Sequence, residues 1–133
     1  MAPGSSSRKI LAALLCIMVF AQREEGGSGG VAAADSRLWP VGDNAGWTFG
    51  VLGWPNFKPF KAGDVLLFKY PAGKHTVVQV NDPGQYGDCE IPANATVWSS
   101  GNDRITLARG VTFFLCGIPG HCKSGMKIAV TAT

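Results

Sequence analysis

Hydrophobic residues in this chain fall into short runs that predict strands rather than helices. β-branched and aromatic residues gather between glycine and proline positions, and no stretch keeps the apolar period of a long helix. Seven short strands in one chain indicate a two-sheet sandwich, an all-β fold class. The predicted strands are 38–41, 65–70, 76–80, 95–98, 104–107, 111–115 and 126–131.

Helix is expected only in two short segments, and both signals are weak. These segments are 54–57 and 83–86. The overlapping stretch 84–92 is predicted to be a loop because of its composition, and the sequence contains no internal repeat.

The first part of the chain has the pattern of an export signal. Basic Arg8 and Lys9 precede an apolar core at 10–21, which is too short to span a bilayer. Small residues favour cleavage after Ala34, with cleavage after Ala21 as the alternative. We therefore interpret 1–34 as a signal peptide and 35–133 as one domain, with no C-terminal anchor.

Charge excludes a nucleic-acid-binding function. The whole chain carries 12 basic and 9 acidic side chains, for a formal net charge of +3. The leader accounts for three of the basic residues and two of the acidic ones, which leaves a domain of charge +2. Its lysines and arginines form no cluster or stripe, so nucleic acid is not an expected partner.

One C-terminal segment carries most of a metal site. Cys116, His121 and Met126 lie five residues apart, and the only other histidine, His75, lies between two predicted strands. A thiolate, two imidazoles and a weak thioether suit copper in both oxidation states. Zinc is the nearest rival, but a structural zinc site favours a fourth strong ligand over a thioether. The alternative without metal treats these residues as a free or paired thiol, surface histidines and core methionine.

The cysteine count is consistent with a metal ligand. Cys16 lies in the predicted leader, so Cys89, Cys116 and Cys122 remain, and an odd number leaves one thiol unpaired in a secreted chain. The metal motif nominates Cys116 as the free thiol, which leaves Cys89 and Cys122 for one disulfide. Pairing of Cys116 with Cys89 is the alternative.

Longer motifs extend over nearly all of 35–133. They are Val41-Gly42, Gly46-Trp47-Thr48-Phe49, and the segments 60–68 and 116–130. With these motifs the chain resembles the phytocyanins, plant blue copper proteins, and among them the plantacyanins or basic blue proteins. The resemblance implies a Greek-key β-sandwich of the cupredoxin type, with a Cys89 to Cys122 disulfide. It also implies one type 1 copper ion on His75, Cys116, His121 and Met126, and an extracellular location in the apoplast or cell wall.

Two positions separate the chain from patterns in related proteins. Stellacyanin-like members carry glutamine where this chain has Met126, a weaker donor that should raise the reduction potential. In cupredoxins the residue after the first ligand histidine is often an asparagine that links the two ligand loops. Thr76 takes that position here, and its hydroxyl is the candidate substitute.

The expected function is one-electron transfer rather than catalysis. Both histidines are committed to metal, so no nucleophile has a partner base, and a four-ligand copper has no open position. We expect a monomer that passes electrons by an outer-sphere route through the edge of His121. An unidentified redox partner would dock near Ile118 and Pro119. The alternative is a non-redox recognition or signalling protein of the cell wall in which copper is mainly structural.

Two other sequence features concern carbohydrate. Asn94-Ala95-Thr96 is a glycosylation sequon in a chain that we expect to be secreted. The four tryptophans at 39, 47, 54 and 98 are predicted to pack in the core rather than to form a carbohydrate platform.

Overall fold

Seven strands carry most of the regular structure in residues 35–133, which are the residues that this computed structural model describes. The predicted leader at 1–34 and its cleavage sites lie outside the described residues. Each observed strand overlaps one of the predicted strands. In chain order they are β1 (Leu38–Pro40), β2 (Val65–Lys69), β3 (Val77–Val80), β4 (Thr96–Trp98), β5 (Asn102–Thr106), β6 (Gly110–Leu115) and β7 (Lys127–Ala132).

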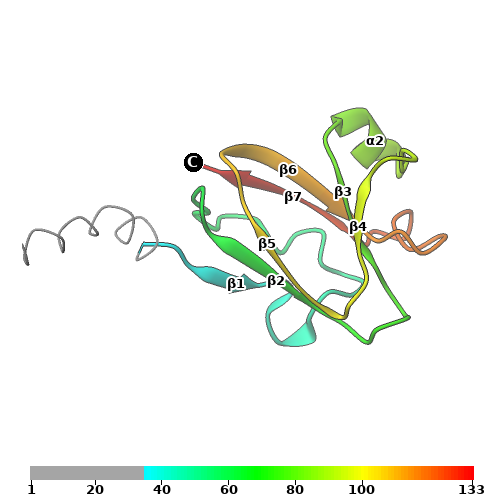
Figure 1. The fold of residues 1–133 in the computed structure, drawn as a ribbon, viewed down its shortest axis with the longest axis horizontal. Coiled ribbons are helices and arrows are strands. Elements are labelled where there is room, and N and C mark those ends of the chain that lie inside the picture. The colour runs from blue at the N-terminus through cyan, green and yellow to red at the C-terminus, as the bar shows by residue number, and fades with distance from the viewer. Residues whose placement is uncertain (1–34) are drawn as a thin grey trace, which may run out of the picture. The chain divides into compact units, whose positions relative to one another are not determined.

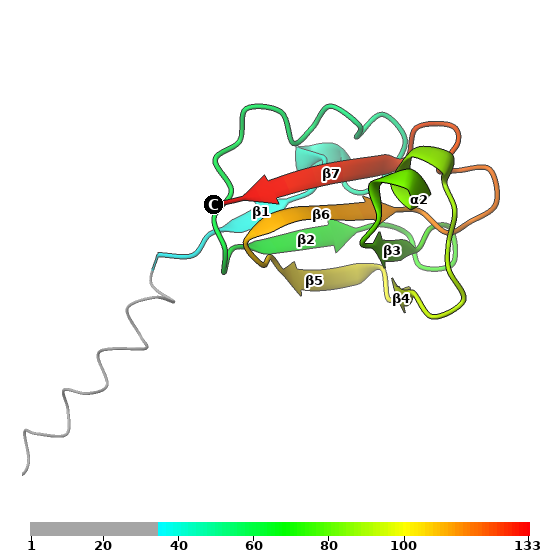
Figure 2. The ribbon, with the colours of Figure 1, turned by 90° about the horizontal axis from the view of Figure 1, so that it is seen from above.

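The strands form two sheets, so the predicted all-β sandwich is confirmed. One sheet has the order β1-β2-β5 and the other has the order β4-β3-β6-β7 (Figures 1 and 2). β1 pairs with β2 in parallel, whereas all other neighbours are antiparallel. The chain changes sheet between β2 and β3, between β4 and β5, and between β5 and β6. Residues from Ser36 to Thr133 belong to one compact unit.

Alternation along the strands places one face of each sheet in a common core. In β2, Leu66 and Phe68 are completely buried, and in β7 Ile128 and Val130 are completely buried. Phe68 contacts Phe114 of β6 with ring centroids 5.2 Å apart. This contact joins the two sheets. Burial of large aromatic side chains supplies much of the stability of a small sandwich.

A short helix covers the outer face of the four-stranded sheet, and part of the loop prediction is therefore wrong. The helix α2 spans Pro83–Asp88, which includes the weak helical candidate 83–86 and overlaps the stretch 84–92 that was expected to be a loop. The Asp82 side chain accepts a hydrogen bond from the Gly84 amide at 2.7 Å, which caps the helix N-terminus. Tyr86 packs on Phe113 at 4.9 Å, so tertiary contact stabilises a segment of low helix propensity.

Two other short segments differ from the helix prediction. Residues 54–57 form turns rather than a helix, and Phe57 has a left-handed backbone with φ of 65°. A 3-10 helix, η1 (Asp43–Ala45), forms where the sequence predicted none. No helix among residues 35–133 is long and apolar enough to cross a membrane.

Two tryptophans lie in the core, as predicted. Trp47 is 1% exposed and Trp39 is 7% exposed, while Trp54 and Trp98 are partly buried against the same cluster. The indole of Trp39 donates a hydrogen bond to Asp64 at 2.8 Å. Burial alone would raise the pKa of Asp64, but this bond and the amides of Lys61 and Arg37 outweigh it, so the pKa lies below its usual value.

Candidate metal centre

Three side chains with metal-binding atoms meet at one end of the sandwich. They are His75, Cys116 and His121, and their candidate ligand atoms all lie within 4.8 Å of one another. His75 lies shortly before β3, and Cys116 directly follows β6. β3 and β6 are antiparallel neighbours with Val78 opposite Leu115, so the sheet brings these two residues to the same end. His121 comes from the loop that connects β6 to β7.

The distances between the three atoms fit a single metal ion. The two Nδ1 atoms are 3.1 Å apart, and the Cys116 sulfur lies 3.5 Å from His121 Nδ1 and 3.9 Å from His75 Nδ1. A point in the plane of this triangle lies about 2 Å from all three atoms, close to ordinary metal–nitrogen and metal–thiolate bond lengths. The three side chains would therefore be able to hold one metal ion between them. Trigonal donor sets of this kind are typical of blue copper sites.

The surroundings of the site favour neutral imidazole. His75 is 8% exposed and Cys116 is 1% exposed, whereas His121 is partly exposed. Burial lowers the pKa of His75, and the proximity of His121 and Lys74 lowers it further. A neutral imidazole keeps a lone pair free for a metal ion, so His75 is prepared to act as a ligand near neutral pH.

Met126 is tied to the other candidate ligands through its backbone. Its amide donates to the carbonyl of His121 at 3.1 Å, and its carbonyl accepts from the Cys116 amide at 3.1 Å. The side chain is completely buried and belongs to the same core cluster as Cys116. The residue therefore lies beside the site, immediately before β7.

The hydroxyl of Thr76 links the two loops that carry the candidate ligands. Thr76 Oγ1 accepts a hydrogen bond from the Gly117 amide at 2.9 Å. The Thr76 carbonyl accepts another from the Trp47 indole, also at 2.9 Å. A Cβ atom on Gly117 would lie 2.8 Å from Thr76 Oγ1, which explains why glycine follows Cys116. The residues next to two of the candidate ligands are thus held together without an asparagine.

The structure contains the disulfide between Cys89 and Cys122, so this pairing is confirmed. Its Cα atoms are 5.8 Å apart, and Cys116 is left as a buried free thiol. The alternative pairing of Cys116 with Cys89 is therefore wrong. The bridge ties the residue after His121 to the end of α2, which restricts the loop that positions this histidine.

Two aromatic residues at the site were not identified as site residues from the sequence. The ring of Phe49 lies 4.8 Å from that of His121 and 5.7 Å from that of His75, and it is 46% exposed. Tyr70 packs near His75 at 6.4 Å and donates a hydrogen bond to the buried Asp103. Burial and this bond raise the pKa of Tyr70 to about 12, so the phenol stays neutral. In the sequence, Phe49 stood out only as part of the motif around Trp47, which carries the family resemblance.

Comparisons with known proteins agree with this geometry. A family model described as a plastocyanin-like domain matches residues 36–126. A chemocyanin from Lilium longiflorum is 46% identical over 135 residues and covers 99% of each chain. A basic blue protein from Arabidopsis thaliana is 53% identical over 97 residues, covering 73% of this chain and 74% of the relative.

Solved structures show the same fold. Cucumber basic protein, a blue copper protein, superimposes with a TM-score of 0.70 at 50% identity, covering 72% of this chain and 99% of its own. Cucumber stellacyanin superimposes with a TM-score of 0.66 at 27% identity, covering 74% of this chain and 97% of its own.

Proposed function

The chain belongs to the phytocyanin family of blue copper proteins, whose domain is plastocyanin-like, and from this premise we propose that it is a secreted carrier of single electrons. The Greek-key cupredoxin fold, the copper cofactor and the absence of an enzymatic role follow from membership of this family. The observation that carries the proposal is the triangle formed by the sulfur of Cys116 and the Nδ1 atoms of His75 and His121.

We assign the ligand roles from the donor set. Cys116 would supply the thiolate, His75 and His121 the two imidazoles, and Met126 a weak thioether. When bound, copper supplies a one-electron couple, since sulfur favours Cu(I) and imidazole accepts Cu(II). The disulfide, the Thr76 to Gly117 link and the backbone bonds of Met126 restrain the donors, so they need to move little between oxidation states.

The partly exposed edge of His121 is the proposed route for the electron. The His121 ring contacts the exposed ring of Phe49, and the His121 amide donates to the carbonyl of the partly buried Ile118, which is followed by the exposed Pro119. An apolar rim around a single polar edge excludes water from a docked partner and shortens the path between the two redox centres. We propose that a redox partner docks on this rim and that the monomer acts outside the cell, in the apoplast or wall.

The function is tested by expressing the full chain in a secretory host and titrating the secreted product with Cu(II). We expect one equivalent to produce an intense blue absorption that disappears on reduction and returns unchanged on reoxidation. Rapid electron self-exchange, measured by line broadening in nuclear magnetic resonance spectra, is expected as well. A blue protein with slow self-exchange would favour the recognition function, in which copper is structural. A colourless protein would contradict the site itself.

Replacing Met126 by glutamine is expected to lower the reduction potential. The amide oxygen is a harder and stronger axial donor than a thioether, so it stabilises Cu(II) relative to Cu(I). We expect a decrease of at least about 59 mV, the value for a tenfold change in a one-electron equilibrium. Protein-film voltammetry measures the shift. Met126→Leu, which removes the donor without adding one, should raise the potential, and an unchanged potential in both variants would exclude Met126 as a ligand.

A further inference from the structure

We propose that Asn94 carries an N-linked glycan, and that its first sugars occupy a polar hollow beside the edge strand β4, where they shield that edge. The proposal rests on secretion, which is part of the proposed function, but not on copper or electron transfer. Of the five asparagines in the chain, only Asn94 is followed by threonine or serine at the second position.

The local structure presents Asn94 to solvent. The Ala95 amide donates to the Pro92 carbonyl at 3.1 Å, so residues 92–95 form a turn with Asn94 near its tip. Asn94 and Thr96 are both exposed, and Thr96 is the first residue of β4. Among residues 35–133 the Asn94 side chain has no hydrogen-bond partner, so its amide is available for modification.

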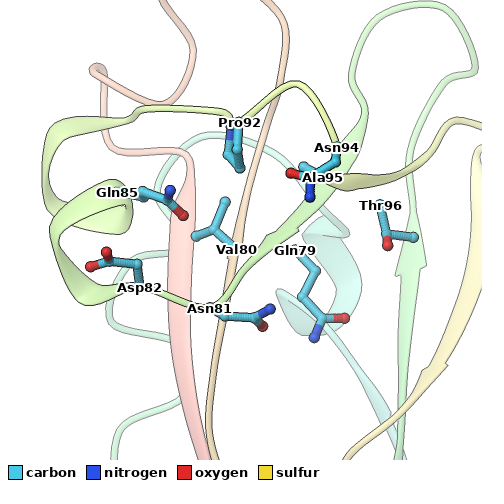
Figure 3. Close-up of a pocket in the computed structure, with 9 residues that line it drawn as sticks. All are labelled: Gln79, Val80, Asn81, Asp82, Gln85, Pro92, Asn94, Ala95 and Thr96. Carbon is cyan, nitrogen blue, oxygen red and sulfur yellow. The ribbon is translucent and has the colours of Figure 1, made fainter.

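A hollow of about 400 Å³ lies directly beside this turn (Figure 3). Its volume is in the range of about 300–1,000 Å³ that is common for small-molecule sites. Figure 3 shows Asn94 at the rim, with Gln85 across the hollow and Gln79 and Asn81 along the strand below. In the described part of the chain, the side-chain amides of Gln79, Asn81 and Gln85 make no hydrogen bonds.

The chemistry of the lining suits carbohydrate. Each side-chain amide offers both a donor and an acceptor, as do sugar hydroxyl and N-acetyl groups. Pro92 and Ala95, both partly exposed, add apolar surface on which the C–H face of a sugar ring can rest. The attachment point and a matching polar surface therefore lie side by side.

The position of the hollow separates it from the metal centre. His75 precedes β3, and Asn81 directly follows the last residue of β3. Because a strand rises by about 3.3 Å per residue, His75 and Asn81 are about 20 Å apart. β4 is the edge of its sheet, and its Val97 is 52% exposed. Exposed edges tend to pair with other chains, so a glycan here would block such pairing and leave the rim at His121 open.

Attachment requires a co-reactant of one class, a lipid-diphosphate-linked oligosaccharide. The Asn94 Nδ2 atom forms a bond to the anomeric carbon of the first sugar. The anomeric C–O bond to the diphosphate breaks, and the lipid diphosphate leaves with the bonding electrons. The Asn94 amide loses one proton, and no oxidation or reduction occurs.

The first test compares the full chain with Thr96→Ala and Thr96→Ser, all expressed through the secretory pathway of yeast. We expect intact-mass spectrometry to show a glycan on the wild type and on Thr96→Ser, which keeps the sequon, and none on Thr96→Ala. Peptide N-glycosidase should remove it. A secreted, folded wild type with unmodified Asn94 would overturn the glycan while leaving the electron-transfer proposal intact. A wild type that stays in the cytosol with its leader attached and without a glycan would contradict secretion and the glycan together.

The second test concerns the hollow. Enzymatic removal of the glycan should speed aggregation of the wild type several-fold while leaving its blue absorption and reduction potential unchanged. The double variant Gln79→Ala/Gln85→Ala should still be glycosylated, but the glycan should be released faster by the glycosidase because it is no longer held. Equal release rates for the double variant and the wild type would overturn the placement of the sugars in the hollow.

Discussion

Replacing Cys116 by serine is expected to abolish the blue absorption of the copper-loaded protein completely. The absorption comes from charge transfer between a thiolate and Cu(II), and Cys116 is the only free cysteine among residues 35–133. A serine hydroxyl is a harder, weaker donor and stays protonated near neutral pH. His75 and His121 would still hold Cu(II), but with the weak absorption and paramagnetic-resonance signal of an ordinary tetragonal site. Optical and paramagnetic-resonance spectra after addition of one equivalent of Cu(II) measure the change.

A control must show that this variant still folds, because Cys116 is 1% exposed. Serine is nearly the same size, so the metal-free variant should unfold cooperatively and keep its near-ultraviolet circular dichroism. Ser124→Ala, in the same loop but on an exposed residue, should keep the full blue colour. An intense thiolate band in Cys116→Ser would show that another sulfur binds the metal.

The second large effect is expected from removal of the disulfide in the double variant Cys89→Ala/Cys122→Ala. The bridge closes a loop with a sequence separation of 33. Chain-entropy estimates for a loop of this length give about 4 kcal/mol of stability at 25 °C. For a domain of this size, that loss should lower the melting temperature by about 20 °C. Chemical denaturation of the metal-free protein measures the free energy of unfolding.

The same variant should also release copper faster. Cys122 directly follows His121, so without the bridge the loop that carries this ligand is restrained only by its backbone hydrogen bonds. Stopped-flow transfer of copper to a chelator measures the rate. A free energy of unfolding within about 1 kcal/mol of the wild type would mean that the sandwich does not depend on the bridge.

The accuracy of the strand predictions and the weakness of the helix prediction at α2 have a common physical explanation. Strands such as β2 and β7 bury alternate residues, and this period of two is visible in the sequence itself. The helix α2 has two glycines and little intrinsic helix propensity, so the sequence predicted helix there only weakly, at 83–86, with an overlapping loop. It forms because Asp82 caps it and because Tyr86 packs on Phe113, which is distant in the sequence.

The candidate site also has one part that the sequence predicted and another that depends on the fold. The nature and spacing of Cys116, His121 and Met126 were sufficient to nominate copper, because donor chemistry is a property of the residue types. That His75 comes within 3.1 Å of His121 depends on the pairing of β3 with β6 and on the loop between β6 and β7. The contact of Phe49 with both imidazoles depends on packing between segments that share no local pattern.

The sequence by itself thus determined the strands, the donor set and the family resemblance, since each depends on the order and chemistry of nearby residues. The tertiary structure confirmed the cysteine pairing, and only it decided that the Thr76 hydroxyl bonds the Gly117 amide and where Asn94 lies relative to a polar hollow and to the metal centre. These features depend on distances between residues that are far apart along the chain. Such distances are set by packing of the two sheets rather than by any local sequence pattern.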